Sequence, residues 1–289
     1  MSNPFDLQDT DAYQSWRDQK LAHAISDTSE LLVEVRNPLA LTVAERRALL
    51  ERCNRSNMAL YASNTEIDEN GLQQLALQLG LKRLDANWLA GEQGISRITV
   101  TESEGVRQSY IPYTDRAIKW HTDGYYNPED RRIRAMVLHC VSPAMSGGIN
   151  RVMDHEIVYL LLRDLDPAHI RALSCNDAMT IPARTDEAGI ARPAQSGPVF
   201  FVDQGTLHMR YTARTRSIEW KDDDATRAAV TCLENLLASG TEHIHTVKLE
   251  ANQGLLCNNV LHDRSGFTDD PLHPRLLFRA RYLDRLSRE

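Results

Sequence analysis

The sequence predicts a fold of the α+β class, or a mainly-β barrel or sandwich, with helices flanking the strands. Strand patterns dominate the middle and the C-terminal part of the chain, and helical patterns lie near the N-terminus and between groups of strands. The 289 residues suit one large domain or two small ones. Because no internal repeat or low-complexity linker interrupts the chain, we expect an N-terminal arm over residues 1–30 and a single domain over residues 31–289.

The expected strands are short runs of alternating or continuous apolar residues bounded by turn residues. Two of them, 197–203 and 207–213, are expected to form a hairpin joined through Gln204-Gly205. The other expected strands are 31–38, 57–63, 95–103, 135–141, 149–154, 242–250, 254–262 and 275–283.

Four helices are expected from their end signals as well as from their apolar spacing. Thr42 precedes the first helix and Glu45 follows three residues later, which is the pattern of a capping box. Gly80 and Gly240 stand where the second and fourth helices should end, and Asp166-Pro167 closes the third. The expected ranges are 43–53, 67–82, 155–165 and 222–240.

Composition narrows the range of partners. The net charge of −7 argues against a nucleic-acid or anionic-membrane surface and favours a small-molecule partner. No apolar run approaches the roughly 20 residues that cross a bilayer, and the N-terminus lacks the pattern of a signal peptide, so we expect a cytoplasmic protein. The five cysteines are scattered, which argues against a disulfide framework or a structural zinc site. The oligomeric state stays open, a homo-oligomer included.

The run KWHTDGYY at 119–126 carries the first chemical signal. His121 and Asp123 are two residues apart, and on a strand such side chains share one face, so both can bind the same metal. His262 ends the run GLLCNNVLH. Two histidines and one carboxylate make the facial triad of iron(II) oxygenases. An isolated H-x-D pair is also common among surface residues and turn caps, so further motifs are needed to distinguish a metal site from these alternatives.

A second signal is the run RLLFRARY, in which Arg275 and Arg279 are four residues apart and should share a strand face. A dicarboxylate that chelates iron through one end needs a cation for its other carboxylate, and Arg offers a two-pronged donor. The alternative is a solvated basic edge strand. A third signal is the Gly147-Gly148 turn, after which Asn150 could hydrogen-bond an oxoacid.

With these motifs in order, the chain resembles the taurine and 2,4-D dioxygenase superfamily. The ordered set is H-T-D at 121–123, Ser-Gly-Gly at 146–148, N-N-V-L-H-D-R at 258–264 and R-x-x-x-R at 275–279. The resemblance spans roughly residues 30–285. Within the superfamily, the motifs look most similar to the γ-butyrobetaine and trimethyllysine hydroxylase branch, which usually has a tyrosine eight residues before the first histidine, as Tyr113 is here.

The resemblance implies a double-stranded β-helix, or jelly-roll, core in a catalytic domain over residues 31–289. It implies that His121, Asp123 and His262 bind Fe(II). It further implies that Arg275 and Asn150 bind the cosubstrate 2-oxoglutarate, and that Arg279 binds an acid group of the substrate.

The chain also departs from the butyrobetaine branch. It is too short for that branch's N-terminal zinc domain and lacks its cysteine pattern, and Arg281 stands where an aromatic wall of the trimethylammonium cage is expected. Tyr113 matches one wall, and Tyr125 follows Gly124 where the chain should bend at the mouth of the site. We therefore expect Tyr113, Tyr125 and Arg279 to bind a small zwitterionic or carboxylate substrate, such as an amino acid or a betaine-like compound.

The implied reaction consumes O2 and 2-oxoglutarate, releases succinate and CO2, and hydroxylates the substrate. A zinc-dependent hydrolase with the same three ligands is one alternative, although it leaves the two arginines without a purpose. A non-catalytic jelly-roll binding protein is the other.

Overall fold

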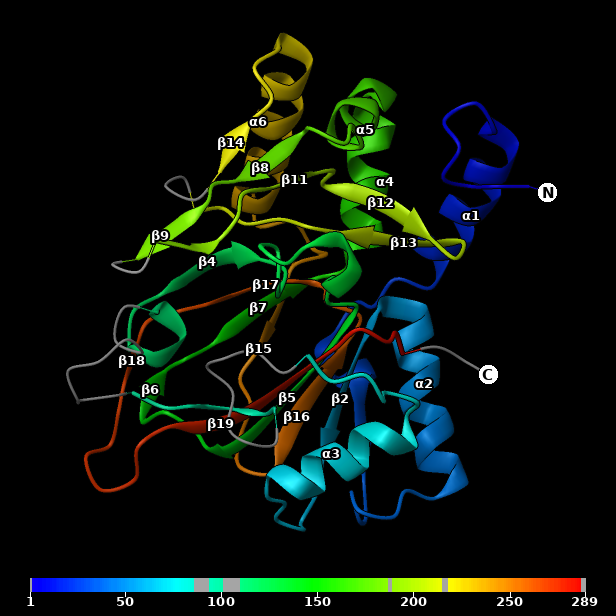
Figure 1. Cartoon of the computed structure of the whole chain (residues 1–289). Coiled ribbons are helices and arrows are strands. Elements are labelled where there is room, and N and C mark those ends of the chain that lie inside the picture. The colour runs from blue at the N-terminus through cyan, green and yellow to red at the C-terminus, as the bar shows by residue number, and fades with distance from the viewer. Residues whose placement is uncertain (1, 86–93, 101–109, 187–188, 215–217, 287–289) are drawn as a thin grey trace.

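Two β-sheets facing each other form the centre of the molecule, and helices cover their outer sides (Figure 1). The computed structural model describes residues 2–85, 94–100, 110–186, 189–214 and 218–286. We call the six-stranded sheet the major sheet and the four-stranded sheet the minor sheet.

The major sheet has the strand order β1-β2-β16-β5-β19-β3, in which only the β1–β2 pair is parallel. Its side chains alternate between two layers. Val137 and Phe278 face outward into a core shared with helices α2 and α3, whereas Met136 and Leu277 face inward. The bounds are β1 Leu32–Glu34, β2 Met58–Ala62, β3 Ser96–Ile98, β5 Ala135–Ser142, β16 Gln253–Cys257, β19 Leu276–Tyr282, α2 Val43–Ser56 and α3 Glu69–Gln78.

The minor sheet has the order β15-β7-β17-β4 and is antiparallel throughout. Val152 and Val247 face the major sheet and share one core with it. Trp120, Met153 and Leu261 face the opposite way into a second core with α4, α5 and α6, against which α1 also packs. The bounds are β4 Ile118–His121, β7 Asn150–Met153, β15 His245–Val247, β17 Leu261–Arg264, α1 Thr10–Ala22, α4 His155–Leu165, α5 Pro167–Leu173 and α6 Asp224–Ala238.

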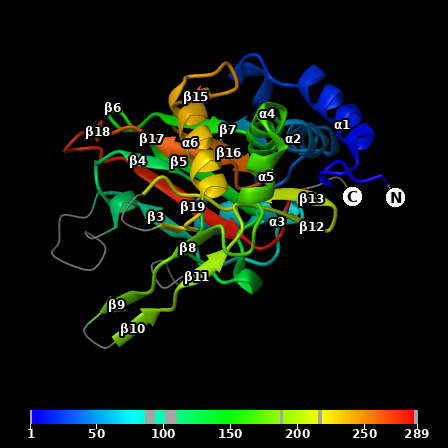
Figure 2. The same ribbon diagram turned by 90° about the horizontal axis from the view of Figure 1, so that it is seen from above.

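Smaller elements surround these sheets. A long hairpin leads out of the α4–α6 layer, and its outer strands β9 and β10 project from the body (Figure 2). The remaining bounds are β6 Ser146–Gly147, β8 Met179–Ile181, β9 Arg184–Asp186, β10 Gly189–Arg192, β11 Gln195–Gly197, β12 Phe200–Asp203, β13 Thr206–Met209, β14 Glu219–Trp220 and β18 Phe267–Thr268. The described residues also include short 3-10 helices at Thr28–Leu31, Ile111–Tyr113 and Glu129–Arg131.

Two local predictions from the sequence are confirmed, the capping box at Thr42 and the turn at Gln204-Gly205. The hydroxyl of Thr42 accepts the backbone N–H of Glu45 at 3.2 Å, and the Glu45 carboxylate accepts the N–H of Thr42 at 2.7 Å, which completes the capping box. Gln204 and Gly205 both have positive φ, 49° and 76°, as the turn between β12 and β13 requires. The mixed helices and antiparallel sheets confirm the predicted α+β fold with a jelly-roll core.

One expected strand is wrong. The run 254–262 is not a single strand but divides into β16 of the major sheet and β17 of the minor sheet. The break falls at Asn258-Asn259, and Asn259 has a left-handed φ of 52°, a conformation that Asn tolerates better than most residues. This turn carries His262 from one sheet to the other.

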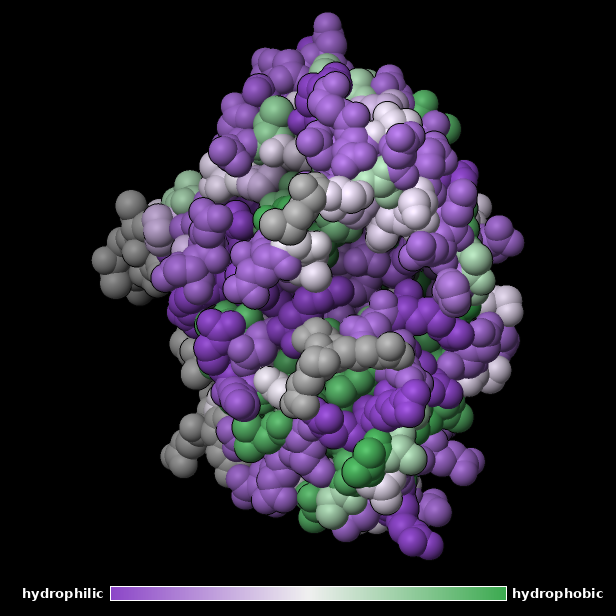
Figure 3. All heavy atoms as spheres, turned by 90° about the vertical axis from the view of Figure 1, so that its right-hand side faces the viewer, coloured by the Kyte–Doolittle hydropathy of each residue, from purple (hydrophilic) through white to green (hydrophobic). Residues whose placement is uncertain are grey.

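The surface is ordinary for a globular protein. The face shown in Figure 3 is mainly hydrophilic, with apolar groups scattered in small clusters. In the part of the chain that the structure describes, no helix is long and apolar enough to cross a membrane.

Candidate metal centre

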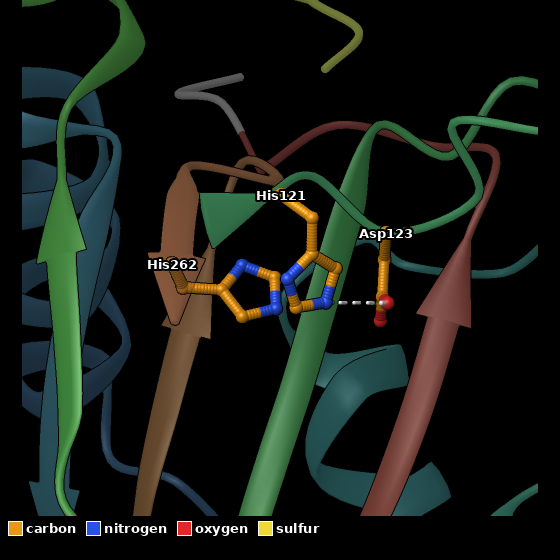
Figure 4. A group of neighbouring side chains, drawn as sticks. All are labelled: His121, Asp123 and His262. Carbon is orange, nitrogen blue, oxygen red and sulfur yellow. Dashed lines mark ion pairs between the residues drawn. The ribbon is translucent and has the colours of Figure 1, made fainter. Parts of the chain in front are cut away.

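Three side chains from two neighbouring strands and one turn point toward one another (Figure 4). His121 is the last residue of β4, and His262 is its register partner on β17. Asp123 lies just past the end of β4, in a turn that Gly124 closes with a φ of +66°. A side chain at position 124 would meet Ile133 at 2.4 Å, so this tight turn requires glycine.

The spacing of the three side chains suits one metal ion. One ligand atom from each residue lies within 4.8 Å of the others, and His121 Nε2 is 3.9 Å from Asp123 Oδ1. The centroids of the two imidazole rings are 4.2 Å apart. Metal–ligand bonds of about 2.1 Å bring two ligand atoms to within roughly 4 Å of each other. The donor set is therefore close to metal-binding geometry.

The hydrogen bonds of both histidines leave the same nitrogen available. Nδ1 of His121 lies 2.9 Å from the Lys119 carbonyl, and Nδ1 of His262 lies 3.0 Å from the Val260 carbonyl. A carbonyl only accepts, so each Nδ1 carries the proton and each Nε2 keeps its lone pair for a metal. Burial and the neighbouring His262 lower the pKa of His121 to about 3, which keeps this imidazole neutral at ordinary pH.

Asp123 is a buried carboxylate with one oxygen unused. Burial by itself raises its pKa, but the charges of Arg279 and Arg281 hold the pKa of this carboxyl well below its usual range. Nη1 of Arg279 donates to Oδ1 at 3.2 Å. Oδ2 has no hydrogen-bond partner within the described residues. A buried anionic oxygen without a donor is costly, and a metal ion would satisfy it.

Asn259 fixes Asp123 relative to His262. Its Oδ1 accepts the backbone N–H of Asp123 at 2.7 Å, and its Nδ2 donates to the Asp123 and Ile133 carbonyls at 3.0 and 2.8 Å. These three bonds join the turn after β4 to the turn before β17. The strand interpretation of 254–262 missed this role, and the Asn-Asn pair was the signal that could have revealed it.

Arg275 is a buried cation with no anionic partner among the described residues. It is 4% exposed, and only its backbone N–H reaches a carboxylate, that of Asp269 at 2.6 Å. Burial lowers its pKa. Gly148 of the Ser-Gly-Gly turn lies beside this guanidinium and has a φ of +65°, a conformation that glycine adopts without strain. An unpaired buried guanidinium is the feature expected of a site for an organic acid.

Asn150 lies on the same sheet face as His262. It is buried and pairs with Arg264 in the register of β7 and β17, and Val152, two residues later, pairs with His262. Arg264 itself was not singled out from the sequence. Its guanidinium donates to the carbonyls of Thr114 and Arg116 at 2.7 and 2.5 Å and so fixes the segment after Tyr113.

The expected substrate residues have different settings. Arg279 contacts Asp123. Tyr113 is 2% exposed at the end of a 3-10 helix. Tyr125 is half-buried in the turn after Asp123, edge-on to Tyr126 at a centroid distance of 5.2 Å. Arg281, at the missing cage wall, donates to the Tyr126 hydroxyl at 3.0 Å and pairs with Asp85 at 2.6 Å.

Arg210 has a structural role, because its hydrogen bonds go to backbone carbonyls. Its guanidinium is buried and donates to the carbonyls of Tyr125, Gln195 and Gly197 at 3.3, 3.2 and 3.0 Å, and to that of Met179. It therefore anchors the base of the long hairpin to the turn that carries Tyr125.

The chain is similar to known dioxygenases. The sequence model of the family described as taurine catabolism dioxygenase TauD, TfdA family matches residues 18–281. A uridine-5'-phosphate dioxygenase from a Streptomyces species is 32% identical over 190 residues, which cover 63% of this chain and 68% of the relative.

Solved structures share the fold. Asparagine oxygenase in complex with Fe(II), 2S,3S-3-hydroxyasparagine and succinate has a TM-score of 0.59 at 13% identity, covering 93% of this chain and 92% of that one. The non-heme iron oxygenase OrfP in complex with Fe and alpha-ketoglutaric acid has a TM-score of 0.61 at 16% identity, covering 84% and 80%.

Proposed function

Because this chain belongs to the taurine catabolism dioxygenase TauD, TfdA family, we propose that His121, Asp123 and His262 hold its iron. The chain is an Fe(II)- and 2-oxoglutarate-dependent dioxygenase that uses O2. The observation that carries the assignment of the ligands is the buried, unsatisfied Oδ2 of Asp123 beside two imidazoles that each keep a free Nε2. The chemistry that iron supplies when bound is the activation of dioxygen, coupled to the decarboxylation of 2-oxoglutarate.

Arg275 supplies the binding energy for the far carboxylate of 2-oxoglutarate in this proposal. Its guanidinium is buried, positively charged and without a carboxylate partner in the described residues, and its planar donors match a carboxylate. Asn150 assists from the same inner sheet face as His262. Both residues bind and orient the cosubstrate.

The substrate is, in this proposal, a small zwitterionic or carboxylate compound such as an amino acid or a betaine-like compound. Arg279 supports an acid group and Tyr125 an aromatic wall, with Tyr113 on the segment that Arg264 positions. Similarity to the γ-butyrobetaine and trimethyllysine hydroxylase branch also favours a small zwitterion. Asparagine oxygenase and OrfP, whose structures contain hydroxylated amino acids, favour hydroxylation of such a compound.

A nucleoside phosphate is the second candidate class of substrate. The Streptomyces relative is named for uridine 5'-phosphate, and the guanidinium of Arg192 lies 5.9 Å from the centroid of the Tyr126 ring, next to Tyr125. We further propose a single catalytic domain over residues 31–289 that acts in the cytoplasm, without a nucleic-acid or membrane partner. The oligomeric state is open to a homo-oligomer.

The test of the ligand assignment combines spectroscopy and product analysis. Anaerobic protein with Fe(II) and 2-oxoglutarate should develop a visible charge-transfer band, and succinate should form when O2 is admitted. A screen of succinate release over amino acids, betaines, sulfonates, aryloxy acids and nucleotides should identify the substrate class. Normal turnover in both His121→Ala and Asp123→Ala would contradict the ligand assignment.

A further inference from the structure

The aromatic ring of Phe267 lies against two buried arginines from different parts of the chain. The guanidinium carbon of Arg264 is 4.8 Å from the centroid of this ring, and that of Arg275 is 5.0 Å from it. Both arginines are only 4% exposed. Because the face of an aromatic ring carries negative potential, this position of the ring favours both cations.

The two arginines differ in what else they contact. Arg264 donates to backbone carbonyls at 2.7 and 2.5 Å, so its guanidinium is fixed by hydrogen bonds. Arg275 forms no ion pair within the described part of the chain, since the carboxylate of Asp269 accepts its backbone N–H instead. A buried cation needs a source of negative potential, and for Arg275 the ring of Phe267 is one.

The backbone of Phe267 is held from two sides, so the ring has a fixed place. Its N–H donates to the carbonyl of Asp115 at 3.0 Å, and β18 pairs with β6 through Phe267 and Gly147 at the edge of the molecule (Figure 1). A side chain at position 147 would lie 2.9 Å from the Cα of Phe267, so the close approach of these two strands requires glycine.

A ring and a carboxylate stabilise an arginine in different ways. A carboxylate takes up N–H donors of the guanidinium and would compete with any acid that binds there. A ring attracts the cation through its face and leaves the N–H donors available. An aromatic partner therefore suits an arginine that has to bind the carboxylate of a ligand and release it again.

We propose that Phe267 is a positioning residue for the cosubstrate. Its ring stabilises the buried guanidinium of Arg275 and leaves the donors of this group free for the far carboxylate of 2-oxoglutarate. The inference deepens the proposed function and rests on it, because it takes Arg275 as the residue that binds this carboxylate. The ring should therefore matter for ligands that have a far carboxylate and not for 2-oxoacids that lack one.

The experiment measures this preference with two probes. Anaerobic protein loaded with Fe(II) is titrated with 2-oxoglutarate and with 2-oxovalerate, which ends in a methyl group in place of the far carboxylate, and the charge-transfer band gives each Kd. Phe267→Leu should weaken the binding of 2-oxoglutarate about three- to thirtyfold, because a cation–π contact is lost, and should change the Kd of 2-oxovalerate little. Phe267→Tyr keeps the ring face and should keep the preference.

Phe201→Leu is the matched control. The ring of Phe201 also lies against a guanidinium, that of Arg132 at 4.1 Å, but it belongs to the hairpin of β12 and β13, so both Kd values should stay unchanged. The inference is overturned if Phe267→Leu keeps the full preference for 2-oxoglutarate, or if it weakens both 2-oxoacids equally, since the ring would then only support the local structure. An equal loss of preference in Phe267→Tyr and Phe267→Leu would also overturn it.

Each of these results leaves the proposed function intact. The proposed function fails instead if the unchanged protein forms no charge-transfer band with 2-oxoglutarate, and this inference then fails with it.

Discussion

The two ends of strand β19 hold their arginines in different electrostatic settings. Directly before the first residue of the strand, Arg275 is buried with no ion pair in the described structure. Further along, Arg279 pairs with Asp123 at 3.2 Å and Arg281 with Asp85 at 2.6 Å. Because a buried cation without an anion is costly, the first end suits an anionic ligand. At the second end the protein's own carboxylates already pair with both arginines, and in the described structure the Nε of Arg279 is left as a buried donor for a substrate acid group. The arginines of the second end therefore keep the metal-binding carboxylate of Asp123 ionised even when no ligand is bound.

The largest effect should come from removing the carboxylate that joins the metal centre to the second end. Asp123→Ala and His121→Ala should both abolish succinate formation, because each removes a metal ligand. Asp123→Ala should also lower the free energy of unfolding of the metal-free protein by about 1–3 kcal/mol more than His121→Ala, since it leaves Arg279 without its partner. Chemical denaturation measures this difference, and equal stabilities would contradict the view that Arg279 is compensated by Asp123.

Exchanging each arginine for lysine tests the two ends directly. Arg275→Lys keeps the charge but loses the forked donor, so the KM for 2-oxoglutarate should rise about ten- to hundredfold while Fe(II) affinity changes little. Arg279→Lys is the matched control, and its main effect should be on Fe(II) affinity through Asp123. The opposite pattern would mean that the roles of the two residues are exchanged.

Asn259 offers a sharper test of how the metal ligands are held. Asn259→Gly keeps the left-handed backbone at φ 52° but removes the three bonds to the Asp123 turn, so Fe(II) affinity should fall about ten- to hundredfold. Asn252→Gly is a matched control, because Asn252 also has a positive φ, 62°, and has no contact with the metal ligands in the described structure. A similar Fe(II) affinity for both variants would show that Asn259 has no positioning role.

The smallest effect on activity is expected on the outward face of the major sheet, away from the ligands, where a change should alter stability alone. Burial lowers the pKa of His139 to about 4, and its Nδ1 lies 2.8 Å from the Tyr61 hydroxyl. As the pH falls, His139 takes up a proton near pH 6.5 in the unfolded chain but only near pH 4 in the folded protein. The contribution of this neutral imidazole to the free energy of unfolding is therefore complete above pH 6.5 and is lost as the pH falls toward 4. The loss amounts to about 3 kcal/mol.

The measurement is the free energy of unfolding at pH 7.5 and at pH 5, compared between the unchanged protein and His139→Gln. The variant should lose less stability on acidification. An identical pH dependence would contradict the assignment, because other buried histidines contribute equally to both proteins.

The sequence by itself determined the local structure and the class of chemistry. The capping box of Thr42 and the Gln204-Gly205 turn depend on residues a few positions apart, so their chemistry can be read without the fold. The ordered motifs around His121 and His262 predicted the family, its cofactor and its fold class, which the comparisons confirm. The position of Gly124 directly after Asp123 also made a turn at the metal centre predictable in outline.

Only the tertiary structure decided how charges and strands pair. The apolar run 254–262 has the pattern of one strand, but packing places its two halves in different sheets. The turn at Asn259 between these halves then holds Asp123 in place by a hydrogen bond. Likewise, Arg210, Arg275 and Arg279 are alike as sequence letters. Arg210 donates to backbone carbonyls, Arg275 has no ion pair among the described residues, and Arg279 pairs with the metal ligand Asp123. The energy of a buried charge depends on neighbours that are distant in the sequence, and folding alone brings them together.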